Sequence, residues 1–209
     1  GRQVNVRFPP KTRKPGKVVL KIENLENQNL RNINLELREG EVLAIAGLVG
    51  SGRTELLRAI FGVDKRWNGR IMCDGQDSPL ISAKQAIEAG IALVPEDRLN
   101  QGIVARQTVS TNLAMIWTQF PQLHRQVEKE ATLASRLVDQ LQIKTPSIQQ
   151  VIAYLSGGNQ QKVVVAKWLA VRSKIMLLDE PTRGIDVGAK LEMYNLIDQL
   201  AHQGMAVIL

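Results

Sequence analysis

Cysteine is nearly absent from this chain, which contains Cys73 alone. A single thiol cannot form an intramolecular disulfide, so we expect a reducing, cytosolic environment. Long apolar runs are also missing, because no stretch approaches the roughly 20 residues that cross a bilayer. The N-terminus lacks the apolar core of a signal peptide. Any membrane role is therefore expected to be peripheral.

Acidic residues are missing from the start of the chain. The first 17 positions contain six basic residues, namely Arg2, Arg7, Lys11, Arg13, Lys14 and Lys17. Subtracting this +6 from the formal charge of +7 leaves about +1 for the rest of the chain. A short basic stretch that also holds Pro9, Pro10 and Pro15 is typical of a solvated linker. We predict an interdomain linker over residues 1–17 and no nucleic-acid partner.

Apolar residues make up 44% of the 209 positions, enough for a substantial core. Alternation over residues 18–23 and 32–37 predicts half-buried antiparallel strands. Short apolar runs predict further strands, at residues 42–46, 69–74, 91–94, 175–179 and 205–209. Helical spacing follows several of these runs, so the fold class is α/β. The last run stops at Leu209, and because the chain also begins in a linker we expect a fragment truncated at its C-terminus.

A helical insert is predicted between about residues 105 and 153, where no strand-like run appears. After a break at Pro121, apolar residues recur at helical spacing, namely Val127, Ala131, Ala134, Leu137, Val138 and Leu141. We therefore predict one domain over residues 18–209 that carries this insert.

A glycine-rich loop lies between a predicted strand and a predicted helix, where residues 47–54 read Gly-Leu-Val-Gly-Ser-Gly-Arg-Thr. Gly47, Gly50 and Gly52 allow positive φ angles and close approach, so backbone N–H groups can converge on phosphate oxygens. The Thr54 hydroxyl is placed to bind Mg²⁺. An ordinary glycine-rich turn is the alternative, and the strand before and helix after the loop favour a phosphate loop.

Two residues depart from the usual form of such a loop. Arg53 stands where Lys is normal, and its planar guanidinium cannot replace a compact ammonium without displacement. Because positioning supplies most of the catalysis in phosphoryl transfer, nucleotide binding can outlast hydrolysis. Glu55 stands where a hydroxyl residue is common, and it is interpreted as a first-turn acid that favours the helix dipole.

Two acids end a buried-looking strand, where Asp179 and Glu180 follow an Ile-Met-Leu-Leu run. Open parallel sheets place ligand groups at this edge, so Asp179 is expected to hold Mg²⁺, through water. Glu180 is placed to orient or deprotonate an attacking water. Capping of the next turn is the alternative, but charge buried there is costly without a cation.

A second anion site is predicted at residues 155–161, which read Leu-Ser-Gly-Gly-Asn-Gln-Gln. Ser156 is expected to cap a helix that begins with Gly157 and Gly158. A single nucleotide does not need two such sites about a hundred residues apart, and a face-to-face dimer resolves this. A capped helix alone is the alternative, but it does not explain the glycine pair.

Together these three segments resemble an ATP-binding cassette domain over about residues 18–209. More narrowly, four segments resemble the second cassette of double-cassette importers of ribose, xylose, galactose or arabinose, namely residues 47–55, 94–98, 155–162 and 179–190. An Arg in the loop is usual for that second cassette. The resemblance implies a P-loop NTPase fold, with a RecA-like mostly parallel sheet, an N-terminal antiparallel β subdomain and an inserted helical subdomain.

The resemblance also implies roles for particular residues, with ATP and Mg²⁺ as cofactors. Residues 47–55, including Ser51, Arg53 and Glu55, would surround the nucleotide phosphates, while Thr54 and Asp179 would hold Mg²⁺ and Glu180 would be the catalytic base. The signature residues would serve ATP on the opposite cassette, namely Ser156, Gly157, Gly158 and Gln160. Glu96 would belong to the nucleotide-binding residues, at a position where active cassettes have a Gln that links Mg²⁺ and water to the coupling surface. Asp186 matches the loop that crosses the dimer interface.

The resulting hypothesis is the C-terminal cassette of a sugar-importer ATPase at the cytoplasmic face of the inner membrane. Its partners would be the first cassette of the same subunit or a second copy, membrane permease subunits and, indirectly, a periplasmic sugar-binding protein. Its own site would be impaired, and its signature would complete the partner's site. One alternative is a non-catalytic, nucleotide-sensing scaffold. Another is a soluble cassette of DNA repair or translation, but the sequence shows neither a long coiled coil nor a basic face for it.

Overall fold

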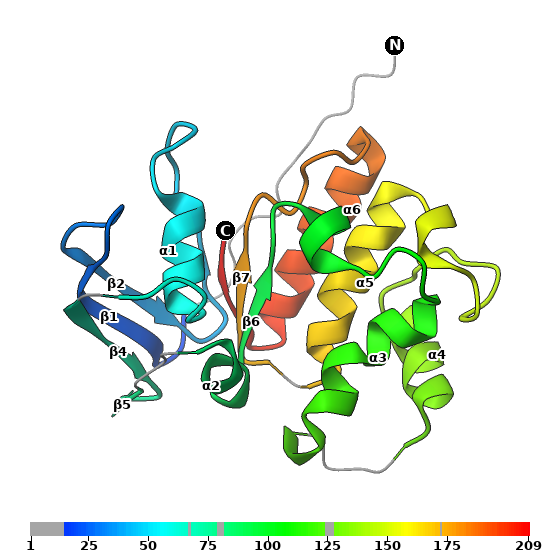
Figure 1. Ribbon diagram of the computed structural model, residues 1–209, viewed down its shortest axis with the longest axis horizontal. Helices are drawn as coiled ribbons and strands as arrows, with labels where there is room; N and C mark the ends of the chain where they lie inside the picture. Colours follow the sequence, from blue (N-terminus) through cyan, green and yellow to red (C-terminus); the bar gives the residue numbers. More distant parts are fainter. Residues whose placement is uncertain (1–14, 67, 79–81, 124–127, 172) are drawn as a thin grey trace.

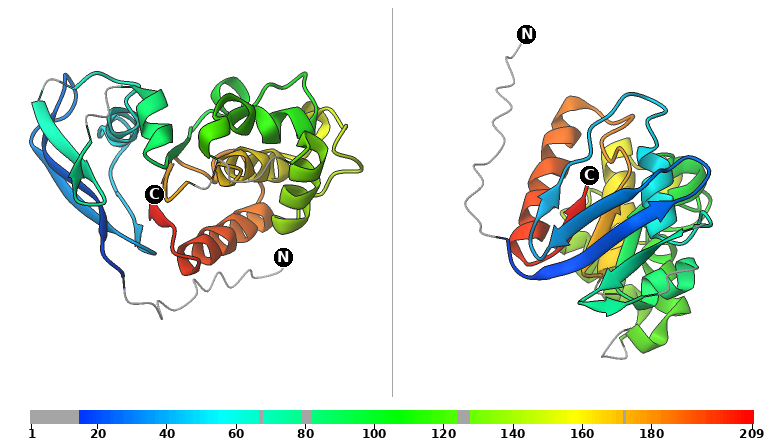
Figure 2. Two further views of the ribbon diagram at one scale, coloured as in Figure 1. Left: turned by 90° about the horizontal axis from the view of Figure 1, so that it is seen from below. Right: turned by 90° about the vertical axis from the view of Figure 1, so that its left-hand side faces the viewer.

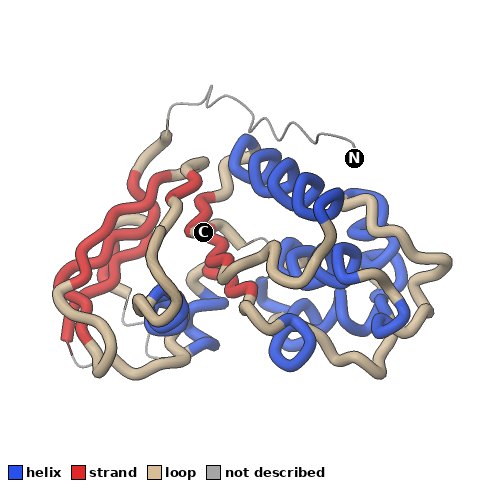
Figure 3. The backbone as a smooth tube through the Cα atoms, turned by 90° about the horizontal axis from the view of Figure 1, so that it is seen from above, coloured by secondary structure: helices blue, strands red, loops and turns tan. Residues whose placement is uncertain are grey.

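The computed structural model describes residues 15–66, 68–78, 82–123, 128–171 and 173–209. Most of the predicted linker and Val127 therefore lie outside the described residues. Two four-stranded sheets and a group of helices make up the described part (Figure 1). Figure 3 shows the antiparallel strands at one end of the molecule and most of the helices at the other.

The first sheet is antiparallel and has the strand order β2-β1-β4-β5. Its members are β1 (Val18–Glu26), β2 (Ile33–Arg38), β4 (Asn68–Cys73) and β5 (Gln76–Asp77). Leu20 pairs with Leu37 and Ile22 with Leu35. Because side chains alternate across a strand, this register sends the predicted apolar positions toward the core.

The second sheet is parallel and has the order β3-β8-β7-β6. Its members are β3 (Val42–Leu43), β6 (Ile91–Val94), β7 (Ile175–Leu178) and β8 (Ala206–Ile208). β3 is shorter than the predicted strand over residues 42–46, although backbone pairing continues to Ile45, whose N–H donates to the Leu209 carbonyl at 2.6 Å. Since all four strands run the same way, the segments after β3, β6 and β7 emerge at one edge of this sheet.

Among the described residues, six α-helices and three short helical turns connect the strands. The α-helices are α1 (Arg53–Ile60), α2 (Ala83–Glu88), α3 (Val109–Gln119), α4 (Glu130–Gln140), α5 (Gly157–Leu169) and α6 (Val187–His202). The turns are η1 (Arg98–Gly102), η2 (Pro121–Leu123) and η3 (Ile152–Tyr154). Figure 2 shows α3 and α4 on the side of the molecule away from the antiparallel sheet. The α/β class with an antiparallel β subdomain and a helical insert is thus confirmed.

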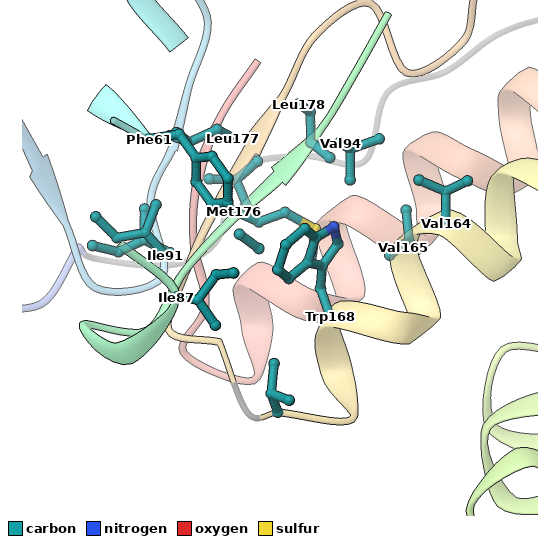
Figure 4. Close-up of a cluster of buried hydrophobic side chains, with 14 of the residues drawn as sticks. Phe61, Ile87, Ile91, Val94, Val164, Val165, Trp168, Met176, Leu177 and Leu178 are labelled. Carbon is teal, nitrogen blue, oxygen red and sulfur yellow. The ribbon is translucent and has the colours of Figure 1, made fainter. Parts of the chain in front are cut away.

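The core of the molecule lies where α5 packs against β6 and β7 (Figure 4). Every residue from 160 to 168 of α5 is buried, so this helix is enclosed on all sides. Near its end, the Trp168 ring meets the edge of Phe61 with ring centroids 5.8 Å apart and an interplanar angle of 82°. Phe61 directly follows α1, so this contact joins the far ends of α1 and α5.

Candidate functional site

The phosphate loop, residues 47–54, leaves the parallel sheet after β3 and opens α1. Gly50 and Gly52 have φ angles of 81° and 90°, in the left-handed region that favours glycine. Gly52 is the N-cap residue of α1, and no side chain caps this helix. Its first backbone N–H groups are therefore open to an anion from outside, which fits the phosphates of a nucleotide.

Thr54 and Asp179 bring two oxygen ligands together beside this loop. Asp179 follows β7 and is 6% exposed. Burial raises the pKa of its carboxyl, whereas a hydrogen bond from the Thr54 hydroxyl and the charge of Arg53 act in the opposite direction. A hydroxyl and a carboxylate in contact suit Mg²⁺, which commonly takes one or two protein ligands together with substrate phosphates. The described residues contain no cluster of three or more His, Cys, Asp or Glu that could hold a metal by itself.

Arg53 and Glu180 form a salt bridge across the site, with 3.0 Å between Nη2 of Arg53 and Oε1 of Glu180. Glu180 has a φ of 44°, which is uncommon for a residue with a side chain. This backbone turn sends Glu180 toward the phosphate loop, while Asp179 before it stays buried. The unusual cation of the loop thus binds the carboxylate expected to act as the base.

Glu96 lies two residues after β6 and forms an ion pair with Arg183. Since β6 and β7 are parallel neighbours, the segments that follow them lie side by side. The sequence reasoning singled out Glu96 but missed Arg183. The sequence did contain a signal for this pair. Arg183 follows Asp179 by four residues, and Glu96 follows the neighbouring predicted strand, so opposite charges could have been expected at the same edge of the sheet.

The signature corner, residues 156–158, opens α5. Ser156 has the backbone angles of an N-cap residue, but its side chain does not cap the helix. Ser156 is thus the predicted N-cap residue, but the side-chain cap is missing, because its Oγ instead accepts from the Asn159 amide at 2.9 Å. Ser156 is exposed. The helix start is thus left free of a side-chain cap and faces outward.

Two of the other predicted signature residues lie deeper. Gly158 is buried, and a Cβ there would lie 2.6 Å from Cβ of Ala189 in α6. Gln160 is 6% exposed and donates to the Ile152 carbonyl at 3.2 Å. Gln160 is therefore a buried residue that holds the start of α5 against residue 152, and it does not face outward.

Asp186 caps α6, where its carboxylate accepts from the Ala189 N–H at 2.9 Å. It is exposed. Figure 1 shows the starts of α1 and α5 along one edge of the molecule, with β6 and β7 between them. The structure therefore brings together Arg53, Thr54, Asp179 and Glu180, whereas the signature corner forms a second, separate helix start without a side-chain cap.

A cavity of about 280 Å³ lies beside the phosphate loop, lined by Thr54, Glu96 and Asp179 and by Lys167 and Trp168 of α5. The ammonium of Lys167 is buried and donates to the Gly102 carbonyl at 2.6 Å. Burial lowers the pKa of Lys167 from 10.5 to about 8. In the described part of the chain, the indole N–H of Trp168 is a buried donor without a hydrogen-bond partner. Sequence reasoning missed both residues, because they read as part of an apolar helix.

Residues 30–183 match the family model described as ABC transporter. The match covers the phosphate loop, the signature corner and the acidic end of β7, and the chain belongs to this family of ATP-binding domains. Members bind ATP, generally with Mg²⁺. The part of the chain that the structure describes contains no helix long and apolar enough to cross a membrane.

Among curated proteins, the chain is 42% identical over 212 residues to the ribose import ATP-binding protein RbsA of Chromobacterium violaceum. It is 43% identical over 215 residues to the RbsA of Halalkalibacterium halodurans. Each alignment covers 100% of this chain and 42% of the relative, so the chain spans about two-fifths of their length.

Solved structures give the same fold. A nucleotide-free ATP-binding cassette from an ABC transporter has a TM-score of 0.77 at 20% identity, covering 92% of this chain and 80% of that one. CbiO1 from Clostridium perfringens, part of the ABC transporter complex cbiONQ, has a TM-score of 0.73 at 24% identity, covering 91% and 76%. At these identities the likeness supports the fold alone.

Proposed function

We propose that this chain is the second nucleotide-binding domain of a sugar-importer ATPase, whose signature corner completes the ATP site of an opposing cassette while its own site is impaired. The observation that carries the proposal is the salt bridge between Arg53 and Glu180. This salt bridge engages the expected base, while Ser156 of the signature corner is exposed and its side chain does not cap α5.

In its own site, the chain would hold ATP through the backbone N–H groups of residues 47–54. Thr54 and Asp179 would hold Mg²⁺, which supplies charge neutralisation at the phosphates when it is bound. Glu180 would orient the attacking water only after it is released by Arg53. Because a displacement of about 1 Å can cost roughly 100-fold in rate, a guanidinium in place of an ammonium supports slow turnover at this site.

At the signature corner, the chain would serve a second ATP. The open start of α5 supplies N–H groups and the positive end of the helix dipole, and Ser156 adds a hydroxyl. Asp186, exposed at the start of α6, would lie against the opposing lobe. The opposing lobe would be the first cassette of the same subunit or a second copy.

The wider assignment is based on the named relatives, which are ribose import proteins. On this proposal the domain spans residues 18–209 after a linker, and it acts as a monosaccharide-transporting ATPase in complex with membrane permease subunits. The complex would lie at the cytoplasmic face of the inner membrane and would receive sugar from a periplasmic binding protein. Uptake would be coupled to ATP binding and hydrolysis.

The test is Ser156→Arg in the full transporter. A side chain of this size should block the opposing site and lower sugar-stimulated ATP turnover by about 100-fold or more, because oxyanion-type donors contribute on that scale. Ser135→Arg is the matched control, since Ser135 is exposed on α4 of the same lobe. Sugar-stimulated turnover that survives Ser156→Arg would refute the proposal.

The second candidate is a non-catalytic scaffold that keeps ATP as a structural ligand, and the engagement of Glu180 by Arg53 fits it as well as the first. Arg53→Lys separates the two. Increased turnover at this site supports an impaired ATPase, whereas unchanged turnover with ATP still bound supports the scaffold. The chain by itself is expected to bind Mg-ATP weakly and to turn it over well below about 1 s⁻¹.

A further inference from the structure

Arg98 lies in the segment after β6 and contacts two other functional segments at once, although the proposed chemistry gives it no role. Its Nη1 donates to the Arg183 carbonyl at 2.9 Å and its Nη2 to the Gly184 carbonyl at 3.2 Å. Its Nε donates to Oε1 of Gln160 at 3.4 Å. One guanidinium therefore links the segment after β6, the segment after β7 and the first turn of α5.

The fit around this guanidinium is tight at the signature corner. A Cβ added to Gly157 would lie 2.7 Å from Nη2 of Arg98, closer than a real contact permits. A Cβ on Gly184 would lie 3.4 Å from Nη1, and Gly184 has a φ of 66°. Gly157 therefore leaves room for the end of Arg98, which lies directly behind this first helical residue of the corner, whereas the distance at Gly184 is that of an ordinary contact.

The position of residue 98 requires the planar guanidinium of an arginine, with its several N–H donors in fixed directions. The guanidinium bonds two successive carbonyls while a third N–H reaches Gln160, and the ammonium of a lysine cannot match that geometry. Gln160 in turn donates to the Ile152 carbonyl, which fixes the amide at its other end. The Glu96–Arg183 ion pair joins the same two segments a second time. Arg98 is thus the common member of a hydrogen-bonded network beneath the outward-facing residues 156 and 186.

We propose that Arg98 is a positioning residue, which holds the signature corner and residues 183–186 in the one arrangement that completes the nucleotide site of an opposing cassette. This inference depends on the proposed function. Arg98 acts through Gln160 and the two carbonyls. Its positive charge behind Gly157 also favours an anion at the corner.

The test compares Arg98→Lys and Arg98→Gln with the parent in the full transporter. Lysine keeps the charge and loses the fork, whereas glutamine keeps a donor and loses the charge. We expect kcat for ATP to fall about 10-fold or more in both variants while KM stays within about two-fold, because misplacement weakens the transition state more than ground-state binding. The matched control is Arg106→Met, an exposed arginine of the same lobe, which should leave both constants unchanged.

A kcat within about two-fold of the parent in folded Arg98→Lys would overturn the inference, as would a rise in KM at constant kcat. Thermal unfolding of each variant shows that it is folded, and if Arg98→Gln does not fold, Arg98→Lys decides. Ser156→Arg is measured alongside. Loss of turnover with Ser156→Arg but not with either Arg98 variant defeats this inference alone, whereas full turnover with Ser156→Arg defeats the proposed function.

Discussion

The phosphate loop and the signature corner both present an open helix start, but they differ in what lies in front of it. At the phosphate loop, Arg53 and Glu180 close on each other across the site at 3.0 Å. At the signature corner, Ser156 turns to Asn159 and leaves the start of α5 facing outward. An anion must therefore compete with an existing salt bridge at the first corner, and at the second it meets no such competitor within the described residues.

Under the proposed function, this difference would make the domain a better partner for an opposing cassette than an ATPase in its own right. A partly exposed ion pair contributes only about 0–1 kcal/mol, so the salt bridge is a weak barrier to binding. Its effect on chemistry is expected to be larger, because the hydrogen bond from Arg53 occupies Oε1, one of the two oxygens with which Glu180 would orient a water. Binding and turnover are thus affected differently at the phosphate loop.

The largest expected effect concerns Lys167, whose buried ammonium lies in the cavity between the two corners. It tests how much this buried charge lowers the stability of the fold. With a folded pKa of about 8 against 10.5 when unfolded, Lys167 destabilises the fold by about 3 kcal/mol below pH 8. Between pH 8 and 10.5 the unfolded state binds more protons, so stability should rise with pH. Other charged residues of the cavity are Arg58, Glu96, Asp97 and Asp179.

The measurement is chemical denaturation of the parent and of Lys167→Met across pH 7 to 11. The difference in unfolding free energy between the two should change by about 3 kcal/mol over the window. Lys84→Met, at an exposed lysine of α2, should show no such trend. A flat difference for Lys167→Met would mean that water reaches the ammonium.

The second effect contrasts the glycines of the two corners. Gly158→Ala should destabilise the fold by about 1–3 kcal/mol, because its Cβ would overlap that of Ala189. Gly50→Ala has nothing within 4 Å of its new Cβ, so it should cost only about 1–2 kcal/mol from its left-handed backbone.

Ala189→Gly distinguishes these two costs. Alone it should destabilise α6 by about 1 kcal/mol, yet in the Gly158→Ala background it should restore stability. In the Gly50→Ala background it should remain destabilising. If the effects of Ala189→Gly and Gly158→Ala on the free energy of unfolding simply add, the two Cβ atoms do not collide. The start of α5 would then be free to move away from α6.

The smallest effect concerns the salt bridge itself. Glu180→Gln should release Arg53 and tighten nucleotide binding by about two- to five-fold, as expected for a partly exposed pair of about 0–1 kcal/mol. Equilibrium titration with a labelled ATP analogue and Mg²⁺ measures this. Glu88→Gln, at an exposed position of α2, is the control. Weaker binding in Glu180→Gln would mean that the pair supports the phosphate loop and does not compete with nucleotide.

Most elements could be predicted from the sequence because their apolar residues repeat with the period of a strand or a helix. The strands 91–94 and 175–178 agree with those patterns. The sequence predicts a helical insert but does not predict α3 as a helix of its own. Buried polar residues such as Asn112 interrupt the apolar face of α3 and hide its period.

The residues of the candidate site also fall into a predictable and an unpredictable group. Residues in consecutive motifs were found from sequence, whereas pairs formed between distant loops were not. The Glu96–Arg183 pair and the fork of Arg98 depend on which strands are neighbours in the parallel sheet. The role of Ser156 depended on a competing local hydrogen bond from Asn159, and spacing alone does not rank such alternatives.

The edge-to-face contact between Phe61 and Trp168 has a mechanical consequence. It joins the trailing ends of α1 and α5, while the leading ends of the same helices carry the two anion-facing corners. Because residues 160–168 of α5 are also buried by their neighbours, this helix is held along its length as well as at its end. The aromatic pair therefore helps to fix the spacing of the two corners from the opposite side of the core.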